Sequence, residues 1–125
     1  MAEINYNQLT DSIIGCAYKV SNKLGCGFLE KVYENAMIVE LKKINLEVKQ
    51  QHPIKVNYEN VCVGEYFADL LINDEVIVEL KAVKNIDEIH SAQLLNYLKA
   101  TNKKIGLIIN FAKPKVEIKR LVNNF

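Results

Sequence analysis

Asp69, Glu79 and Lys81 stand out because two carboxylates and an ammonium group fall within two adjacent apolar segments. Residues 66–72 and 76–81 alternate as strands do, with a short polar connection between them. Successive side chains of a strand point to opposite faces, so one face is predicted to be apolar and buried. The buried face would hold Ala68, Leu70, Ile72, Val76, Val78 and Leu80, and the other would hold Phe67, Asp69, Leu71, Ile77, Glu79 and Lys81.

The length of the turn between these strands decides which residues face each other. A two-residue turn at 73–74 would pair Asp69 with Val78 and put a carboxylate on the same face as a core valine. A three-residue turn at 73–75 pairs Asp69 with Glu79 and keeps the apolar residues on one side. We therefore predict the three-residue turn, with the two β-carbons roughly 5 Å apart.

Two carboxylates at that separation repel each other, so one must take up a proton or a cation must bind between them. Oxygen ligands suit Mg²⁺ or Mn²⁺, and Mg²⁺ keeps several waters, one of which could act as a nucleophile. Lys81 lies on the same face and would add positive charge for a phosphoryl-transfer transition state. The alternative is an exposed ion-pair patch without function, and on spacing alone the two interpretations are equally supported.

Two segments of helical character carry further polar residues that share a face. Glu30 and Tyr33 lie three residues apart. Alone, they are better explained as a first-turn acid favoured by the helix dipole and a core aromatic residue. His90, Gln93 and Tyr97 fall at i, i+3 and i+7 and would form one polar stripe, for which an ordinary amphipathic helix is the simpler explanation.

The remaining pattern predicts the elements that hold these residues. Apolar residues recur at helical spacing in three segments, 7–24, 29–44 and 87–101, the last with Asp87 as its N-cap. Strand-like segments fall at 47–58, 61–72, 75–83 and 104–111, with a short edge strand within 113–120. Three antiparallel strands followed by a helical crossover into another strand predict an α/β fold, a mixed sheet flanked by helices.

The composition predicts one ordinary domain over residues 1–125, with half of the residues hydrophobic and a quarter charged. The net charge is +1, so composition alone does not indicate a nucleic-acid-binding protein. The three cysteines are odd in number and lack metal-ligand spacing, which argues against a zinc site or a disulfide framework. No signal-peptide pattern and no membrane-length apolar run are seen, so we expect a cytoplasmic location.

Taken together, these residues resemble a known family. Asp69, followed on the next strand by Glu79-Leu80-Lys81, resembles the motif of the PD-(D/E)xK nuclease superfamily. The predicted order of elements resembles its restriction-endonuclease-like core. Three further groups of residues resemble its small GxxExxY branch. They are Gly27, Glu30 and Tyr33; His90, Gln93 and Tyr97; and the segment 106–111.

The resemblance covers about residues 13–111 and implies a nuclease that hydrolyses phosphodiester bonds of DNA or RNA with Mg²⁺ or Mn²⁺. It implies a homodimer or a protein partner that helps to enclose a duplex; a catalytically silent nucleic-acid- or protein-binding module is the alternative. Ala68 stands where the motif's name has proline. The implied site residues are Asp69, Glu79 and the Leu80 carbonyl as metal ligands, Lys81 as catalytic lysine, Glu30 as a further acid and candidate ligand, and Gln93, Tyr97, Tyr33 and His90 around them.

Overall fold

The computed structural model describes residues 5–123, and its elements follow the predicted order. The helices are α1 (Tyr6–Leu24), α2 (Glu30–Lys43) and α3 (Glu88–Thr101). The strands are β1 (Val48–Tyr58), β2 (Val61–Ile72), β3 (Val76–Lys81), β4 (Ile105–Asn110) and β5 (Glu117–Val122). Asp87 caps α3 as predicted, while the last strand lies slightly later than expected.

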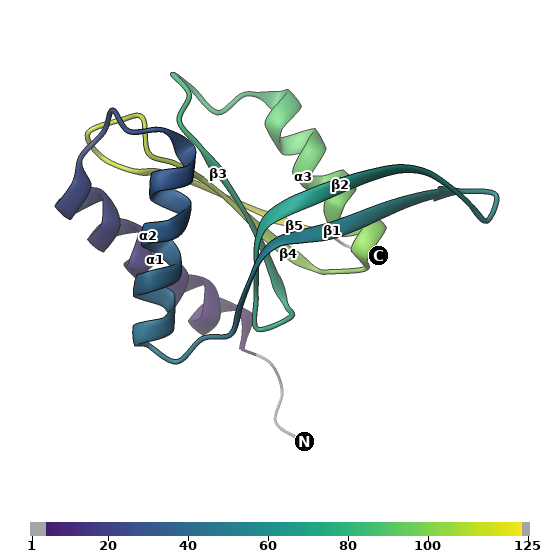
Figure 1. Cartoon of the computed structure of the whole chain (residues 1–125), viewed down its shortest axis with the longest axis horizontal. Coiled ribbons are helices and arrows are strands. Elements are labelled where there is room, and N and C mark those ends of the chain that lie inside the picture. Colours follow the sequence, from purple (N-terminus) through teal and green to yellow (C-terminus); the bar gives the residue numbers. More distant parts are fainter. Residues whose placement is uncertain (1–4, 124–125) are drawn as a thin grey trace.

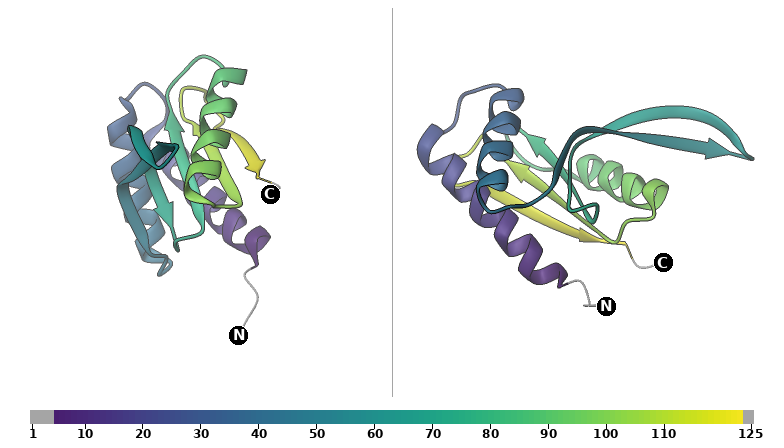
Figure 2. Two further views of the ribbon diagram at one scale, coloured as in Figure 1. Left: turned by 90° about the vertical axis from the view of Figure 1, so that its right-hand side faces the viewer. Right: turned by 60° about the horizontal axis from the view of Figure 1, so that its bottom comes forward.

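The five strands form one sheet in the order β1-β2-β3-β4-β5. Only β3 and β4 run parallel, and α3 connects them because parallel neighbours cannot be joined by a tight turn. Helices α1 and α2 cover one face of the sheet and α3 covers the other (Figure 1; Figure 2, left). The predicted α/β fold, a mixed sheet flanked by helices, is confirmed.

Both faces of the β2–β3 hairpin are buried, and here the prediction of a single buried face was wrong. Leu71 and Ile77 were predicted on the face opposite the buried one, yet they are completely enclosed, because α3 packs on that side through Leu94 and Leu98. The opposite side packs against α1 and α2 through Leu70, Ile72, Val76, Val78 and Leu80.

Ala68 lies on the α3 side, not with Leu70 as strict alternation predicts. The cause is local: Gln51, which lies opposite Asp69 on β1, has a left-handed backbone with φ 53°. The regular pairing of β1 with β2 is interrupted there, between Gln50↔Leu70 and His52↔Ala68. Such an irregularity twists the strands, and the alternation of faces therefore fails once, next to Asp69.

The β1–β2 hairpin extends well beyond the rest of the sheet. Strand β2 pairs with β3 only over residues 70–72, whereas its pairing with β1 extends from Ile72 to Val61, interrupted at Asp69 and shifted in register near the far end. We call residues 52–67 the arm. It leaves the sheet beside α3 and projects past it (Figure 1; Figure 2, right). None of the helices within residues 5–123 is long and apolar enough to cross a membrane.

Candidate active site

Asp69 and Glu79 face each other across β2 and β3. The last regularly paired residues are Leu70 and Val78, and the turn comprises residues 73–75. Asp69 and Glu79 are the next pair along the ladder, where regular pairing stops. The predicted three-residue turn is therefore confirmed, together with the opposition of the two carboxylates.

The two carboxylates take over the hydrogen bonds that the diverging strands no longer make. The backbone N–H of Asp69 donates to Glu79 Oε1 at 3.2 Å, and the backbone N–H of Leu80 donates to Asp69 Oδ2 at 2.8 Å. Each side chain thus satisfies a backbone donor of the opposite strand, which would otherwise be buried without a partner. This exchange fixes both carboxylates at the point where β2 leaves β3.

Neither carboxyl group is in a setting that favours its charged form. Glu79 is only 7 % exposed, and burial together with the adjacent Asp69 raises the pKa of Glu79 to about 8. Burial also raises the pKa of Asp69, and Glu34 and Glu30 add to this, against the hydrogen bonds from Leu80 and Gln51. Desolvation and like-charge repulsion have this effect, and a bound cation would relieve both.

Helix α2 brings two acids towards the same place. Oε1 of Glu30, the first residue of α2, accepts a hydrogen bond from the backbone N–H of Ala82 at 3.2 Å, next to Lys81. Glu34 follows one turn later on the same side of the helix and is only 4 % exposed. With Asp69, both line a hollow of about 630 Å³.

Glu34 and Gln51 are residues that the sequence analysis missed. Glu34 accepts hydrogen bonds from Lys31 Nζ at 2.8 Å and from Gln51 Nε2 at 3.0 Å. The same amide nitrogen donates to Asp69 Oδ1 at 3.3 Å. A chain of contacts therefore runs from α2 through β1 to the carboxylate pair. The i, i+4 spacing of Glu30 and Glu34 was the available signal.

Tyr33 does not reach the carboxylates but braces the loop before α2. Its hydroxyl donates to the carbonyl of Gly25 at 2.7 Å and accepts from the N–H of Phe28 at 3.2 Å. Its ring is fully buried and stacks on Phe111 with centroids 4.5 Å apart. Gly27, in the same loop, has φ 112°, a conformation open to glycine. The loop so held delivers Glu30 to the site.

Gln93 and Tyr97 approach from the other side of the sheet, on α3. Gln93 Nε2 donates to Tyr97 Oη at 3.0 Å. Burial raises the pKa of Tyr97, and the Glu79 carboxylate raises it further. Tyr97 packs in the same core cluster as Ile77, which lies two residues before Glu79 on β3. His90 instead caps α3, since its Nδ1 accepts the backbone N–H of Asp87 at 3.2 Å.

Lys81 ends β3, half-buried, and its charge lowers the pKa of Glu79. Its carbonyl accepts a hydrogen bond from the N–H of Phe111 at 2.9 Å. The neighbouring Asn110, completely buried, donates to the carbonyl of Val83 at 2.8 Å and accepts from its N–H at 3.1 Å. Asn110 thus anchors the segment that follows the lysine. In the sequence, the only indication of this role was that Asn110 is a polar residue at the end of the otherwise apolar strand β4.

The donor set suits a hard cation only in part. Within residues 5–123, no group of three or more His, Cys, Asp or Glu side chains is arranged to hold a metal ion. Asp69 and Glu79 nevertheless place two carboxyl groups side by side, each with a raised pKa. Mg²⁺ and Mn²⁺ take such oxygen ligands, and Mg²⁺ typically fills the rest of its shell with water.

A larger hollow, of about 850 Å³, lies between the arm and α3. His90, Gln93 and Tyr97 line it, but Asp69, Glu79 and Lys81 do not. Size alone supplies no chemistry, so the candidate active site is the carboxylate pair and not the larger hollow. Tyr97 lies between the larger hollow and the carboxylate pair, because it lines the hollow and packs with Ile77, two residues before Glu79 on β3.

Comparison with known proteins gives the family. The family model described as the PD-(D/E)XK nuclease superfamily matches residues 7–121. A search of curated proteins gave no match. Among solved structures, the chain resembles SSO0001, with TM-score 0.55 and 19% identity over 95% of this chain and 59% of that one. It also resembles an alkaline exonuclease (LHK-Exo) from Laribacter hongkongensis, with TM-score 0.50 and 11% identity over 99% of this chain and 73% of that one.

At these identities the two structures show a shared fold. The chain spans 59% of the length of SSO0001, so it matches only part of that protein. The family model, by contrast, covers almost the whole chain and includes every residue of the candidate site. The predicted restriction-endonuclease-like core is confirmed. The chain belongs to the PD-(D/E)XK nuclease superfamily.

Proposed function

We propose that this chain is a divalent-metal-dependent nuclease that hydrolyses phosphodiester bonds of DNA or RNA. One observation carries the proposal: Asp69 and the buried Glu79 are opposed and both have a raised pKa, with Lys81 two residues further along β3. Nucleases of this superfamily generally use divalent metal ions. The carboxylate pair is the part of the described structure that most needs a cation.

In this proposal Asp69, Glu79 and the carbonyl of Leu80 hold Mg²⁺ or Mn²⁺, with Glu30 as a further candidate. When bound, the metal supplies Lewis acidity and an activated water. Lys81 binds a phosphate oxygen and stabilises the charge that develops on it. Because Tyr97 accepts from Gln93, its own O–H is free to donate to a phosphate oxygen, and its raised pKa keeps that proton in place.

We also propose that the chain is a GxxExxY protein, because the three residues of that motif act together here. Gly27 permits the turn between α1 and α2, with φ 112°. Tyr33 ties that turn down through Gly25 and Phe28. Glu30 then extends to the backbone beside Lys81. Each residue type is accounted for by a physical role in delivering one acid to the site.

Cleavage assays test the proposal directly. Linear, circular and single-stranded DNA and RNA would be incubated with the protein in Mg²⁺ or Mn²⁺. We expect cleavage that disappears in Asp69→Asn and Lys81→Ala. The matched controls Asp11→Asn and Lys104→Ala change exposed residues of the same types and should cleave as the original chain does. Cleavage that persists in Asp69→Asn comes from a contaminant and removes the assignment.

A catalytically silent binding module is the second candidate. It is favoured by the hydrogen bonds that already occupy both oxygens of Asp69 and one of Glu79, and by the lack of a three-ligand group within residues 5–123. Calorimetric titration with Mn²⁺ separates the two candidates. A metal that binds only the folded chain must raise its melting temperature, so a silent module would show neither heat nor shift.

A further inference from the structure

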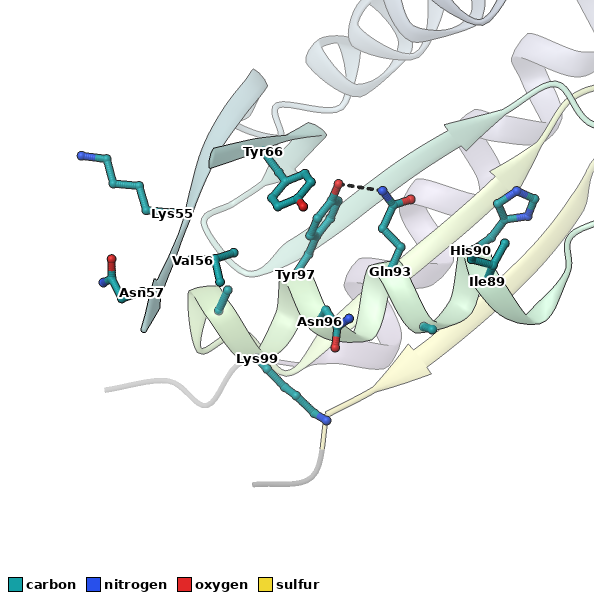
Figure 3. Close-up of a pocket in the computed structure, with 12 residues that line it drawn as sticks. Lys55, Val56, Asn57, Tyr66, Ile89, His90, Gln93, Asn96, Tyr97 and Lys99 are labelled. Atoms are coloured by element: carbon teal, nitrogen blue, oxygen red, sulfur yellow. Dashed lines mark hydrogen bonds between the residues drawn. The ribbon is translucent and has the colours of Figure 1, made fainter. Parts of the chain in front are cut away.

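The hollow between the arm and α3 is built differently from the carboxylate pair. Its lining is mixed in polarity, with side chains from both walls, and includes Lys55, Asn57 and Tyr66 of the arm and Gln93, Tyr97 and Lys99 of α3 (Figure 3). Its volume of about 850 Å³ is well above that of the hollow beside Asp69. It is therefore large enough to hold a ligand at least the size of a small organic molecule.

The charge of this hollow is one-sided. Among the described residues that line it, two are lysines and one is a histidine, and none is an aspartate or a glutamate. The chain as a whole is nearly neutral, with 16 basic and 15 acidic residues, so this separation is local. Lys55 and Lys99 stand at its margins on opposite walls (Figure 3). A ligand with a negatively charged backbone fits this arrangement.

Two tyrosines form the centre of the hollow. The rings of Tyr66 and Tyr97 lie 5.7 Å apart and are tilted by 44° (Figure 3). Tyr97 is nearly buried and is held by Gln93, whereas Tyr66 is 49% exposed. Tyr66 therefore presents a supported aromatic face to solvent. Aromatic faces of this kind stack on nucleic-acid bases whatever the base, at about 1 to 3 kcal/mol each.

The form of nucleic acid follows from these features. A base can stack on Tyr66 only if its own face is free, and in a duplex both faces are covered by neighbouring base pairs. Duplex binding depends mainly on many phosphate contacts, which a nearly neutral chain with a single arginine does not offer. Stacking, two lysines and the amides of Asn57 and Gln93 suit an unpaired strand instead.

We propose that the hollow between the arm and α3 binds single-stranded nucleic acid, with Tyr66 as the stacking platform and Lys55 and Lys99 on the phosphates. The proposal rests on the proposed function, since it names the form of nucleic acid that would be presented to the carboxylate pair. Tyr97 lines the hollow and packs in the same core cluster as Ile77, which lies two residues before Glu79 on β3. A strand held in the hollow would therefore lie close to the carboxylate pair.

Binding can be measured without cleavage, on the full chain in EDTA. Fluorescein-labelled dT12, rU12 and a 12-base-pair DNA duplex serve as probes in fluorescence anisotropy. We expect both single strands to bind more tightly than the duplex. Two lysine contacts predict a slope of log K against log salt of about −1.4, and Lys55→Ala should reduce it by about 0.7. The ratio of the dT12 and rU12 affinities tells DNA from RNA.

Tyr66→Ala should weaken binding of the preferred strand about 5- to 150-fold, and Tyr66→Phe should restore it, because the phenyl ring keeps the stacking face. The matched control is Tyr58→Ala, which removes a 67% exposed tyrosine of the arm outside the hollow and should bind as the original chain does. Melting curves for each variant establish that the fold is intact.

Three results would overturn the proposal: tighter binding of the duplex, equal binding by Tyr66→Ala and the original chain, or an equal loss in Tyr58→Ala. The outcome is independent of turnover, because no metal is present. If strands bind through Tyr66 but Asp69-dependent cleavage is absent in Mg²⁺ and Mn²⁺, the proposed nuclease function fails while the binding site stands. If cleavage occurs without Tyr66-dependent binding, the reverse holds.

Discussion

The buried carboxyl group of Glu79 should make the stability of this fold depend on pH. Its pKa rises from an ordinary value of 4.5 to about 8 in the folded chain. Between these values the folded state keeps a proton that the unfolded state has released. The free energy of unfolding therefore falls as the pH rises through this range. At about 1.36 kcal/mol per pH unit, protonation of Glu79 contributes about 5 kcal/mol to the free energy of unfolding. This contribution is fully present below pH 4.5 and is lost above pH 8.

Glu79→Gln removes this dependence. The amide is neutral at every pH, has the shape of the protonated carboxyl group, and keeps an oxygen that can accept the N–H of Asp69. In EDTA we expect the variant to exceed the original chain in free energy of unfolding by about 3 to 5 kcal/mol at pH 9. At pH 5 the difference should shrink to about 1 kcal/mol or less, because pH 5 lies only half a unit above the ordinary pKa of 4.5 and little of the linked free energy has been lost.

Urea unfolding followed by circular dichroism at pH 5, 7 and 9 measures these differences. Glu65→Gln, which changes an exposed residue on the same strand as Asp69, is the matched control and should show no pH-dependent gain. A variant that is less stable than the original chain at pH 9, or a difference that does not change with pH, would refute the account of Glu79 as a desolvated carboxyl group. Adding Mn²⁺ at pH 8 should stabilise the original chain and leave Glu79→Gln unchanged.

Three further substitutions test how the site is held. Gly27→Ala should lower stability by about 1 to 3 kcal/mol through backbone strain at φ 112°. The control Gly15→Ala, in α1 with open space around it, should raise stability by about 0.5 to 1 kcal/mol. Thermal melting of the two variants measures the difference. Gly106→Ala would bring a methyl group within 2.8 Å of Leu94 and should cost about 1 to 3 kcal/mol, with partial recovery in combination with Leu94→Val. Asn110→Ala would leave the N–H and carbonyl of Val83 unpaired, costing about 1 to 3 kcal/mol by urea unfolding, while an unchanged value would show that this segment is held by other contacts.

The hairpin could be predicted from the sequence because its information is local. Alternation of apolar residues and the length of the turn together fixed the opposition of Asp69 and Glu79. The burial of both faces was not predicted, since it depends on a helix outside the hairpin. That helix is α3, which lies between β3 and β4 in the chain and packs on the sheet through Leu94 and Leu98. The position of Ala68 on the α3 side of the sheet could not be predicted either, because the residue pattern of β2 does not indicate the irregular backbone at Gln51 on β1.

The acids of α2 show a second limit. Glu30 was singled out only through the family resemblance, and Glu34 not at all, because a glutamate on a helix ordinarily faces solvent. Lys31, three residues earlier on the helix, pairs with its carboxylate, but the contact that encloses it is long-range: Gln51 donates to it and is available only because β1 runs beside α2. The periodicity of one helix cannot reveal a partner supplied by a strand seventeen residues later.

One local departure accounts for both the carboxylate pair and the hollow beside the arm. Gln51 interrupts the β1–β2 ladder at Asp69, and β2 leaves β3 at the same point. Backbone donors at Asp69 and Leu80 then lack strand partners, and the two carboxylates satisfy them at the cost of lying side by side in a setting that raises the pKa of each. The same divergence carries the arm away from β3 and opens the space that Tyr66 and Tyr97 line. A continuous β2–β3 ladder would close that space and direct the N–H of Asp69 to a carbonyl, so the carboxylate pair and its neighbouring hollow arise together.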